Sequence, residues 1–391
     1  MQMGVHLSNV LWTEEERSFR EEVRSFCEKE IYPRAREIDE GPYPKELIRK
    51  LGKEGYMGVH HAEDVGGTNK GLSYEIIVAE EISAANPGVD MARMASTTLY
   101  GMPIARFGTD EQKEKYLVPV VAGKKIGCIG ITEPNVGSDA AGMETMAEKD
   151  GDEWVINGEK HYITNGSQAD YMCCFAITDP SVHPKKGMSA FIVDTSTDGF
   201  EVVCDHDLMG MKSARVSHLK LDNVRVDSSL MLGEPGQGFT ILMDELDSER
   251  TAIAGEAIGY GRTPYEVAVE YSDEREQFGR KIRLFEGISF KIADMAMKLE
   301  AGRALTLTAA RMYDQGMKIT KEAAIAKLYT TETAIEITNS ALQVLGGAGY
   351  TTEYPVERFL RDARLMTIGG GTAEILRFLI QREVFRESLD Q

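Results

Sequence analysis

The chain has 391 residues, of which 42% are hydrophobic and 27% are charged, and its formal net charge is −19. This length exceeds what one hydrophobic core usually supports, so two or three subdomains are expected. The acidic balance, with Lys and Arg scattered along the chain, argues against a protein that binds nucleic acid.

The sequence shows no targeting or membrane-spanning pattern. Its first residues lack a charged-then-apolar signal pattern, and no window approaches the roughly 18 uninterrupted apolar residues of a membrane helix. The five cysteines have no metal-ligand spacing, and Cys173 and Cys174 lie in the run "YMCCFAI", which predicts buried strand thiols. We therefore expect a cytoplasmic protein with reduced thiols, no metal site and no membrane insertion.

The first part of the chain, residues 1–123, is predicted to be an α-helical domain. Thr13 and Glu16 have the spacing of a capping box, and the apolar residues that follow recur at helical spacing. More segments of this kind continue to about Gly123.

Residues 124–240 are predicted to form a β domain, because the apolar period changes to two. Turn signals at Asn157–Gly158 and Asn165–Gly166 bracket the segment "EKHYIT". Residues 241–391 return to helical spacing, most clearly at Ile288, Ile292, Met295 and Leu299. This order of elements predicts an α+β fold with three domains.

One proline interrupts the helical pattern of the last domain. Pro264 falls inside a predicted helix that begins near Ser248 and continues toward Tyr271. An interior proline costs about 3 kcal/mol and usually kinks or breaks a helix. A kink is therefore predicted at this position.

The segment "GITEPNVGSDAAGM" is polar and glycine-rich, a composition that ordinary β turns also have. Together with "INGEKHYITNG" it resembles the flavin-binding β domain of the acyl-CoA dehydrogenases. Three further segments stand in that family's order and spacing: "DEREQFGRKI", "QVLGGAGYTTEYPVERFLRDAR" and "GGTAEILRFLIQREV". The resemblance spans nearly the whole chain and implies an FAD-dependent enzyme. Its expected fold is an N-terminal helical domain, a middle β-barrel-like domain and a C-terminal four-helix bundle.

The resemblance also implies roles for residues around the flavin ring. Thr132 would bond the ring, Ser138 would lie near the cofactor or the CoA moiety, and Thr164 would approach flavin N5. Tyr162 stands where many members have tryptophan, so a smaller aromatic side chain would still shield the flavin face. Thr372, which ends the loop "GGGT", would contact the cofactor as well.

Other residues would reach the adenine-diphosphate half of an FAD bound by a neighbouring subunit: Arg275, Phe278, Gln343, Gly346 and Gly347. A pyrophosphate suits a fork-shaped cation and closely approaching backbone, which arginine and glycine supply. A solvated helix charge is the plain alternative for Arg275. The shared site implies a homotetramer.

The implied reaction is the α,β-desaturation of a CoA thioester, in which a carboxylate removes the Cα proton and hydride leaves Cβ for flavin N5. Many members carry that carboxylate in a loop "YEGT", which aligns with "GGGT" here, so its position is Gly370. Long-chain and isovaleryl-type members instead place glutamate before a substrate-contacting arginine, and Glu249–Arg250 match this pattern.

Glu249 is therefore the first candidate base. Arg250 is expected to bind the CoA chain and to point away from Glu249. The alternative interpretation of Glu249 is a surface carboxylate at a helix start, where the helix dipole favours it.

Asp90, in "AANPGVDMARM", is the second candidate base, because this stretch in the family starts a helix that lines the acyl pocket. A carboxylate stabilised by the helix N-terminus, after the Asn86–Pro87 turn, would explain it equally well. If Asp90 faces the pocket, it could deprotonate a γ carbon of a ring and give a conjugated diene by 1,4-elimination.

Gly369 and Gly370 remove two side chains where the acyl group would meet the flavin, which predicts a wide, short pocket. Such a pocket suits an alicyclic acyl group, and the sequence resembles the branch that handles cyclohexane- or cyclohexene-carboxyl-CoA in anaerobic aromatic metabolism. Glycine also occurs in this loop in long-chain members, so a branched- or long-chain substrate with Glu249 as base is the alternative.

The family resemblance implies an electron-transfer flavoprotein as the electron acceptor. Two other functions fit the same fold. A flavin oxidase would pass electrons to oxygen, but oxidases that resemble this family are usually much longer. A non-catalytic flavin- or acyl-CoA-binding protein would have lost its base, which Glu249 and Asp90 argue against.

Overall fold

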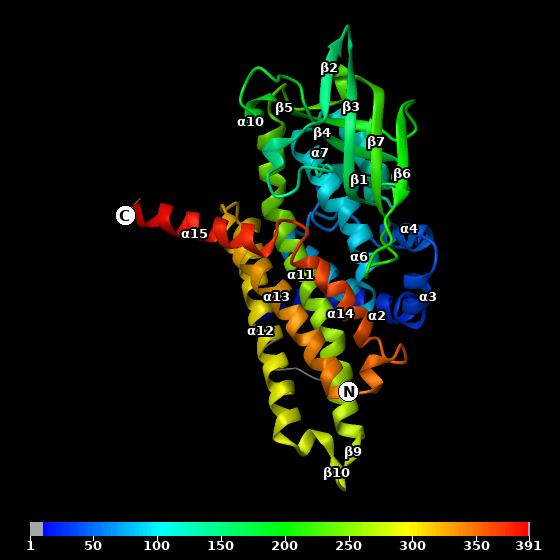
Figure 1. The fold of residues 1–391 in the computed structure, drawn as a ribbon, viewed down its shortest axis with the longest axis vertical. Helices are drawn as coiled ribbons and strands as arrows, with labels where there is room; N and C mark the ends of the chain where they lie inside the picture. Colours follow the sequence, from blue (N-terminus) through cyan, green and yellow to red (C-terminus); the bar gives the residue numbers. More distant parts are fainter. Residues whose placement is uncertain (1–10, 390–391) are drawn as a thin grey trace.

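A computed structural model describes residues 11–389 of the chain (Figure 1). The first region is helical, and its capping box is confirmed: Thr13 Oγ1 accepts from Glu16 N, and Glu16 Oε2 accepts from Thr13 N at 2.7 Å. The helices of this region are α2 (Glu14–Glu30), α3 (Ala35–Glu40), α4 (Lys45–Lys53), α5 (Leu72–Ala85), α6 (Pro87–Met94), α7 (Gly101–Phe107), α8 (Asp110–Gln112) and α9 (Val118–Val121).

The middle region is one strongly curved sheet with a short helix, α10 (Pro184–Gly187). Its strands run in the order β6-β7-β3-β2-β4-β5-β8, and β1 pairs in parallel with β4. The strands are β1 (Gly127–Gly130), β2 (Met146–Asp150), β3 (Glu153–Thr164), β4 (Tyr171–Ile177), β5 (Met188–Asp194), β6 (Phe200–Asp205), β7 (Val216–Asp227) and β8 (Met231–Leu232). Cys173 and Cys174 are buried in β4, as the sequence predicted.

One predicted turn of this region is wrong. Asn157–Gly158 does not end a strand, because β3 continues through it and only shifts register against β7 between Ile156 and Gly158. A Cβ at Gly158 would lie 2.4 Å from Thr145 Oγ1, so glycine allows β2 and β3 to approach closely here. The second predicted turn, at Asn165–Gly166, does end β3.

The last region is a bundle of long helices that carries a two-stranded hairpin at its tip (Figure 1). The predicted apolar face of residues 288–299 lies inward, with Met295 and Leu299 buried. The elements are α11 (Gly238–Glu274), β9 (Glu276–Gln277), β10 (Arg280–Lys281), α12 (Glu286–Asp314), α13 (Thr320–Leu345), α14 (Val356–Met366) and α15 (Ala373–Leu389).

Helix α11 differs from its prediction at its start, and Pro264 lies in its interior. It begins at Gly238 rather than near Ser248, and it continues without interruption through Pro264 to Glu274. Tertiary packing outweighs the propensity cost of about 3 kcal/mol, because the residues around Pro264 are buried against α5 and Thr263 Oγ1 donates to the Ala84 carbonyl at 2.6 Å. Glu249 therefore lies inside the helix and not at its N-terminus.

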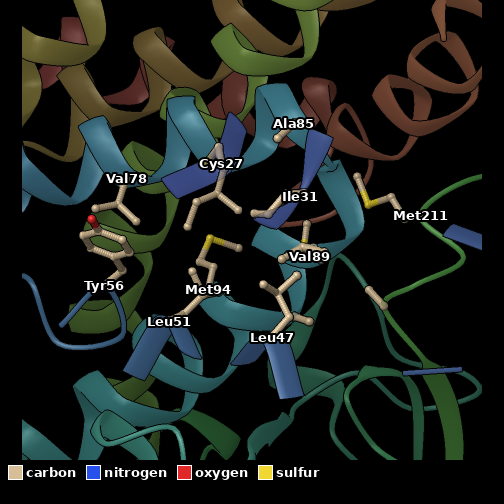
Figure 2. Close-up of a cluster of buried hydrophobic side chains, with 14 of the residues drawn as sticks. Cys27, Ile31, Leu47, Leu51, Tyr56, Val78, Ala85, Val89, Met94 and Met211 are labelled. Atoms are coloured by element: carbon tan, nitrogen blue, oxygen red, sulfur yellow. The ribbon is translucent and has the colours of Figure 1, made fainter. Parts of the chain in front are cut away.

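A buried apolar cluster joins the N-terminal helices to α11 and positions α6. Figure 2 shows Val89 and Met94 of α6 packed near Ile31, Leu47 and Leu51. Because these side chains are buried, the helix that carries Asp90 is held against its neighbours. Among residues 11–389, none of the helices is long and apolar enough to cross a membrane.

Candidate active site

The candidate base Glu249 is buried on α11, with 7% of the residue exposed. Burial raises the pKa of its carboxyl, and the positive charges of Arg250 and Lys327 oppose that effect. A surface carboxylate at a helix start, the alternative interpretation, is wrong because the helix begins three turns earlier, at Gly238.

The loop between α14 and α15 brings Gly370 directly over Glu249. Gly370 and Gly371 have φ values of +64° and +95°, a backbone region that favours glycine. A Cβ on Gly370 would lie 3.3 Å from Glu249 Oε1 and 2.5 Å from Ile253 Cδ1. The structure thus brings together Gly370 and Glu249, which lie far apart in the sequence. The Glu249 carboxyl lies beside the point from which a side chain at position 370 would extend.

Lys327 of α13 holds this loop and was missed by the sequence analysis. Its ammonium donates to the carbonyls of Gly369 and Gly371, both at 2.7 Å. Burial lowers the pKa of Lys327 to about 8, and Glu249 acts in the opposite direction. The sequence did not predict this role, because Lys327 ends an ordinary helical run, "AIAK", and its acceptors are backbone carbonyls far along the chain.

Arg250 was expected to point away from Glu249. Its ion pair is with Asp247 Oδ1 at 3.6 Å, one turn back on α11. The Nε atom of Arg250 is buried and has no hydrogen-bond partner within residues 11–389. The Arg250 guanidinium is therefore paired through Nη1, while its Nε is a buried donor without an acceptor, next to the candidate base.

Asp90 is completely buried at the start of α6. Its Oδ1 accepts from Arg93 Nε at 2.5 Å, one turn later on the same helix. Asn86 caps this helix by accepting from Val89 N at 3.1 Å, and Asn165, at the end of β3, donates to the Ala92 carbonyl at 2.8 Å. The helix N-terminus and Arg93 together explain how a carboxylate is accommodated here.

Asp90 does not lie beside Glu249. Its carboxyl faces Glu256, which is seven residues further along α11 than Glu249 and hence about 10 Å along the helix axis. A separation of seven residues places Glu249 and Glu256 on the same face of that helix. The two candidate bases therefore lie at two levels along one face of α11. Glu249 is on this face, Asp90 contacts it at Glu256, and Ile253 lies between the two levels.

The residues predicted to surround the flavin ring lie on the sheet. Thr132 accepts from His161 N through its carbonyl at 2.8 Å, so it stands next to β3, which carries Tyr162 and Thr164. Tyr162 has a φ of +58° and is 61% exposed. Its ring stacks on His161, with centroids 4.2 Å apart. An exposed aromatic ring on the strand that also carries the partly exposed Thr164, next to the partly exposed Thr132, fits the flat polar ring of a flavin, and Ser138 is exposed.

The residues predicted to hold the adenine-diphosphate half lie elsewhere. Arg275 and Phe278 are at the β9–β10 tip of the bundle, the end opposite the sheet in Figure 1. Phe278 is 94% exposed, and Gln343, Gly346 and Gly347 are exposed at the end of α13. One chain does not bring these residues to the flavin-ring residues. Thr372 is partly buried, and its Oγ1 accepts from Ile375 N at 3.3 Å at the start of α15.

Family comparisons match almost the whole chain in three parts. The matches are the acyl-CoA dehydrogenase N-terminal domain over residues 13–124, the middle domain over 128–224 and the C-terminal domain over 236–385. The short-chain-specific acyl-CoA dehydrogenase of Clostridium acetobutylicum is 39% identical over 96% of this chain and 99% of its own length.

Two solved structures have the same fold. Butyryl-CoA dehydrogenase from Megasphaera elsdenii superposes with a TM-score of 0.93 at 38% identity, covering 98% of this chain and all of that one. A structure from Acidaminococcus fermentans, described with an electron transferring flavoprotein and electron bifurcation, gives 0.94 at 36% identity over 99% and 100%.

These similarities confirm the predicted fold class, with its helical, sheet and helical regions. They also establish FAD as the cofactor and make the protein an oxidoreductase. The short-chain names of the relatives do not support the predicted alicyclic branch. From the three domain matches and the buried glutamate beside a glycine loop, it follows that this chain belongs to the acyl-CoA dehydrogenase family.

Proposed function

We propose that this acyl-CoA dehydrogenase desaturates a compact acyl thioester and uses Glu249 to remove the Cα proton. The observation that carries this proposal is the contact between the loop and the helix: a Cβ on Gly370 would lie 3.3 Å from Glu249 Oε1. The helix carboxyl thereby occupies the neighbourhood of the position at which many relatives carry a loop glutamate. A base is obligatory for this chemistry, and Glu249 is the carboxylate nearest that loop position in the described contacts.

The surroundings of Glu249 suit proton removal. Burial raises the pKa of its carboxyl toward neutral pH, where a general base is most effective. Arg250 and Lys327 supply positive charge nearby, which acts against the rise in the pKa and favours the ionised form that can accept a proton. Lys327 also ties the loop carbonyls on both sides of Gly370, so the distance between base and loop is fixed.

FAD, when bound, supplies an acceptor for the hydride that leaves Cβ with both electrons of its bond. The hydroxyls of Thr132 and Thr164 would orient the flavin ring, and Tyr162 would cover its face. Arg275, Phe278 and the loop after α13 would hold the other half of the cofactor of a second subunit. Their position at the far end of the bundle supports a homotetramer in which subunits share FAD sites (Figure 1).

We propose an alicyclic acyl group as the substrate, a cyclohexane- or cyclohexene-carboxyl thioester. Gly369 and Gly370 leave the loop without side chains, and relatives named for short-chain and butyryl-CoA substrates support a compact acyl group. A straight short chain is the competing outcome of the test. An electron-transfer flavoprotein is the proposed electron acceptor, which the similarity to the Acidaminococcus structure supports.

A second reaction is favoured by the state of Asp90. Its Oδ2 is buried without a hydrogen-bond partner in the described part of the chain. Asp90 faces Glu256, which lies two helical turns beyond Glu249 on α11. On a cyclohexene thioester, Asp90 would take a proton from the γ carbon. The bonding pair of that C–H bond would form a new double bond, the existing double bond would shift, and hydride would leave the opposite β carbon.

The test mixes the yellow enzyme, without oxygen, with cyclohexanecarboxyl-CoA, cyclohex-1-ene-1-carboxyl-CoA and butyryl-CoA in separate experiments. Flavin absorbance and the products are followed for the wild type, Glu249→Gln and Asp90→Asn. Bleaching by the saturated ring that only Glu249→Gln abolishes supports the first reaction. A diene that only Asp90→Asn abolishes supports the second, and bleaching by butyryl-CoA alone rejects the alicyclic substrate.

A further inference from the structure

Three helices bring a group of buried ionisable side chains together at the level of Asp90. Glu75 comes from α5, Asp90 and Arg93 from α6, and Glu256 from α11, and all four are 0% exposed. Apolar side chains of the same two helices, α5 and α6, are buried in the cluster that Figure 2 shows, among them Val78, Val89 and Met94. A set of charges in such surroundings must balance within itself, because water does not reach it.

The hydrogen bonds and ion pairs of this group centre on one guanidinium. Arg93 lies 2.5 Å from Asp90 Oδ1 and 2.7 Å from Glu75 Oε1, and its Nη1 donates to the Tyr56 carbonyl at 3.3 Å. Glu75 also contacts His60 Nδ1 at 3.0 Å. The guanidinium therefore serves Asp90 and Glu75, and within residues 11–389 it makes no hydrogen bond or ion pair with Glu256.

Three carboxyl groups thus face a single arginine. Both oxygens of Glu256 and Oδ2 of Asp90 are buried without a hydrogen-bond donor among residues 11–389. The two carboxyl groups are nevertheless within hydrogen-bonding reach of each other. Two carboxylates cannot bond to one another, because neither has a proton to donate, whereas a carboxylic acid and a carboxylate can. One proton on this pair would join Asp90 Oδ2 to one oxygen of Glu256 in a hydrogen bond and remove one buried negative charge.

We propose that Glu256 holds this proton and donates it in a hydrogen bond to the Asp90 carboxylate, so that Glu256 sets the basicity of Asp90. Glu256 is then a positioning residue: it acts on the substrate only through Asp90. This inference rests on the proposed function for its catalytic consequence, since Asp90 is the group that would take the γ proton. The protonation of the pair itself is a property of the enzyme without substrate.

The direction of the titration agrees with this assignment. Burial raises the pKa of Glu256 well above its usual range, and the neighbouring Asp90 raises it further. Burial also raises the pKa of Asp90, to about 6, while Arg93 and the hydrogen bond from Glu256 oppose that rise. Glu75, as a like charge, also raises the pKa of Asp90. The other titratable groups that interact with the pair are Tyr260 of α11, whose pKa is raised by both carboxyls, and Cys27 of α2, whose pKa is raised by Asp90.

The first measurement is an infrared difference spectrum of the FAD-loaded enzyme against Glu256→Gln at neutral pH. A carbonyl stretch of a protonated carboxylic acid should be present in the wild type and absent from the variant. In Asp90→Asn the same band should persist at a shifted frequency, because the acceptor of the Glu256 proton has changed. If Glu256→Gln removes only carboxylate bands, Glu256 is ionised and the proposal is overturned.

The second measurement titrates the Asp90 carboxylate band in Glu256→Gln and Glu256→Leu. An amide can still donate to Asp90, so the midpoint in Glu256→Gln should stay close to that of the wild type. Leucine cannot donate, so the midpoint should rise by about one pH unit, which corresponds to one lost hydrogen bond to a charged group. Equal midpoints in both variants would overturn the proposal, even if the proteins fold and bind FAD normally.

Turnover of cyclohex-1-ene-1-carboxyl-CoA then separates this inference from the proposed function. If the thioester is turned over, the acid limb of the rate profile should move upward in Glu256→Leu and stay in place in Glu256→Gln. If the thioester is not a substrate, the proposed second reaction fails, while the two infrared results still decide where the proton lies.

Discussion

Helix α11 carries buried charge in two stretches that differ in their supply of cations. The cation-poor stretch, residues 245–256, has one buried arginine, Arg250, and three buried glutamates, Glu245, Glu249 and Glu256. One turn and a half later, Arg262 donates to Glu81 of α5 at 2.5 and 2.8 Å. Glu81 and its neighbour Glu80 are also contacted by further arginines, namely Arg20, Arg24 and Arg303.

The pKa values of the two stretches move in opposite directions although all of these carboxyls are buried. The arginines overcome the effect of burial and lower the pKa of Glu80 to about 2 and that of Glu81 well below its usual range. In the other stretch burial prevails, and the pKa values of Glu245, Glu249 and Glu256 are raised. The comparison indicates that the arginine-rich stretch holds helices together, whereas the cation-poor stretch holds carboxyls that can exchange a proton.

The strongest test of this contrast is Glu249→Gln. The substitution keeps the size of the side chain and removes the basic group, so reduction of the flavin by a saturated thioester should slow by about 10²–10⁴-fold. Stopped-flow absorbance without oxygen measures this rate. The absorbance spectrum of the bound flavin should be unchanged, since Glu249 is not among the residues expected to hold it.

Glu245→Gln is the matched control, one turn earlier on the same helix. Glu245 faces the buried Cys173 of the sheet and makes no contact with the glycine loop in the described contacts. Burial raises the pKa of its carboxyl well above the usual range, which favours the uncharged form, so an uncharged amide of the same size should be tolerated with little change in rate. Equal losses in both variants would show that the cation-poor stretch acts as a whole and that Glu249 has no special role.

A substitution in the arginine-rich stretch, where Arg262 contacts Glu80 and Glu81, should lower the free energy of unfolding and leave the reaction rate unchanged. Arg262→Leu leaves two buried carboxylates short of a partner, and breaking such a pair typically costs about 3–5 kcal/mol. Chemical denaturation of the FAD-loaded enzyme, followed by circular dichroism, measures this loss. Arg386→Leu is the control: this arginine is 65% exposed and 3.9 Å from Glu383, so its loss should cost less than about 1 kcal/mol.

The two stretches should also depend on pH in opposite senses. Glu256 has a raised pKa in the folded protein, so the folded state binds more protons than the unfolded chain above the ordinary carboxyl pKa. The free energy of unfolding then falls as pH rises, by up to about 1.4 kcal/mol per pH unit for one such group. Glu80 and Glu81 have lowered pKa values, so their contribution is present above the unfolded pKa and is lost as pH falls toward 2.

Glu256→Gln should therefore flatten the decline in stability as pH rises from the ordinary carboxyl pKa range through the Asp90 pKa of about 6, because the raised pKa of Glu256 is then absent. Denaturation midpoints across this range measure the slope. Arg262→Leu should lower the whole curve without changing that slope. An unchanged slope in Glu256→Gln would mean that Glu256 titrates normally in the folded protein.

The sequence predicted Glu249 and Asp90 as candidate bases but contained no information about the environment that distinguishes them. The dipeptide Glu249–Arg250 and the loop "GGGT" are separated by more than a hundred residues, and only a family resemblance connects them. Glu256 gave no signal, because an isolated glutamate in a helical pattern is normally a surface residue. Its partner Asp90 comes from another helix, and sequence spacing contains no information about such pairs.

The same limit explains the helix and strand boundaries that were wrong. Local rules placed a helix start near Ser248 and a turn at Asn157–Gly158, where packing in the folded protein favours a continuous helix and a continuous strand. The capping box at Thr13 was predicted correctly because Thr13 and Glu16 bond to each other, and the turn at Asn165 was predicted correctly because Asn165 has a φ of +67°, a backbone region that asparagine tolerates.

The smallest expected effect concerns the room above Glu249. Gly370→Ala puts a Cβ 2.5 Å from Ile253 Cδ1 and close to the carboxyl, so Ile253 or the loop must shift. Gly371→Ala is the matched control, since it has a similarly positive φ but its Cβ would meet only ordinary contacts at 3.8 Å and beyond. Both should lose about 1 kcal/mol of stability from the left-handed backbone alone.

Only Gly370→Ala should also change the choice of substrate. A methyl group in the acyl region is worth about a factor of ten in discrimination, so kcat/KM for the cyclohexane thioester should fall about tenfold relative to butyryl-CoA. Steady-state rates with both thioesters measure the ratio. If the ratio is the same in Gly370→Ala and Gly371→Ala, the loop glycines are needed for the backbone conformation and do not determine the acyl group. The width of the site must then be set by residues outside this loop.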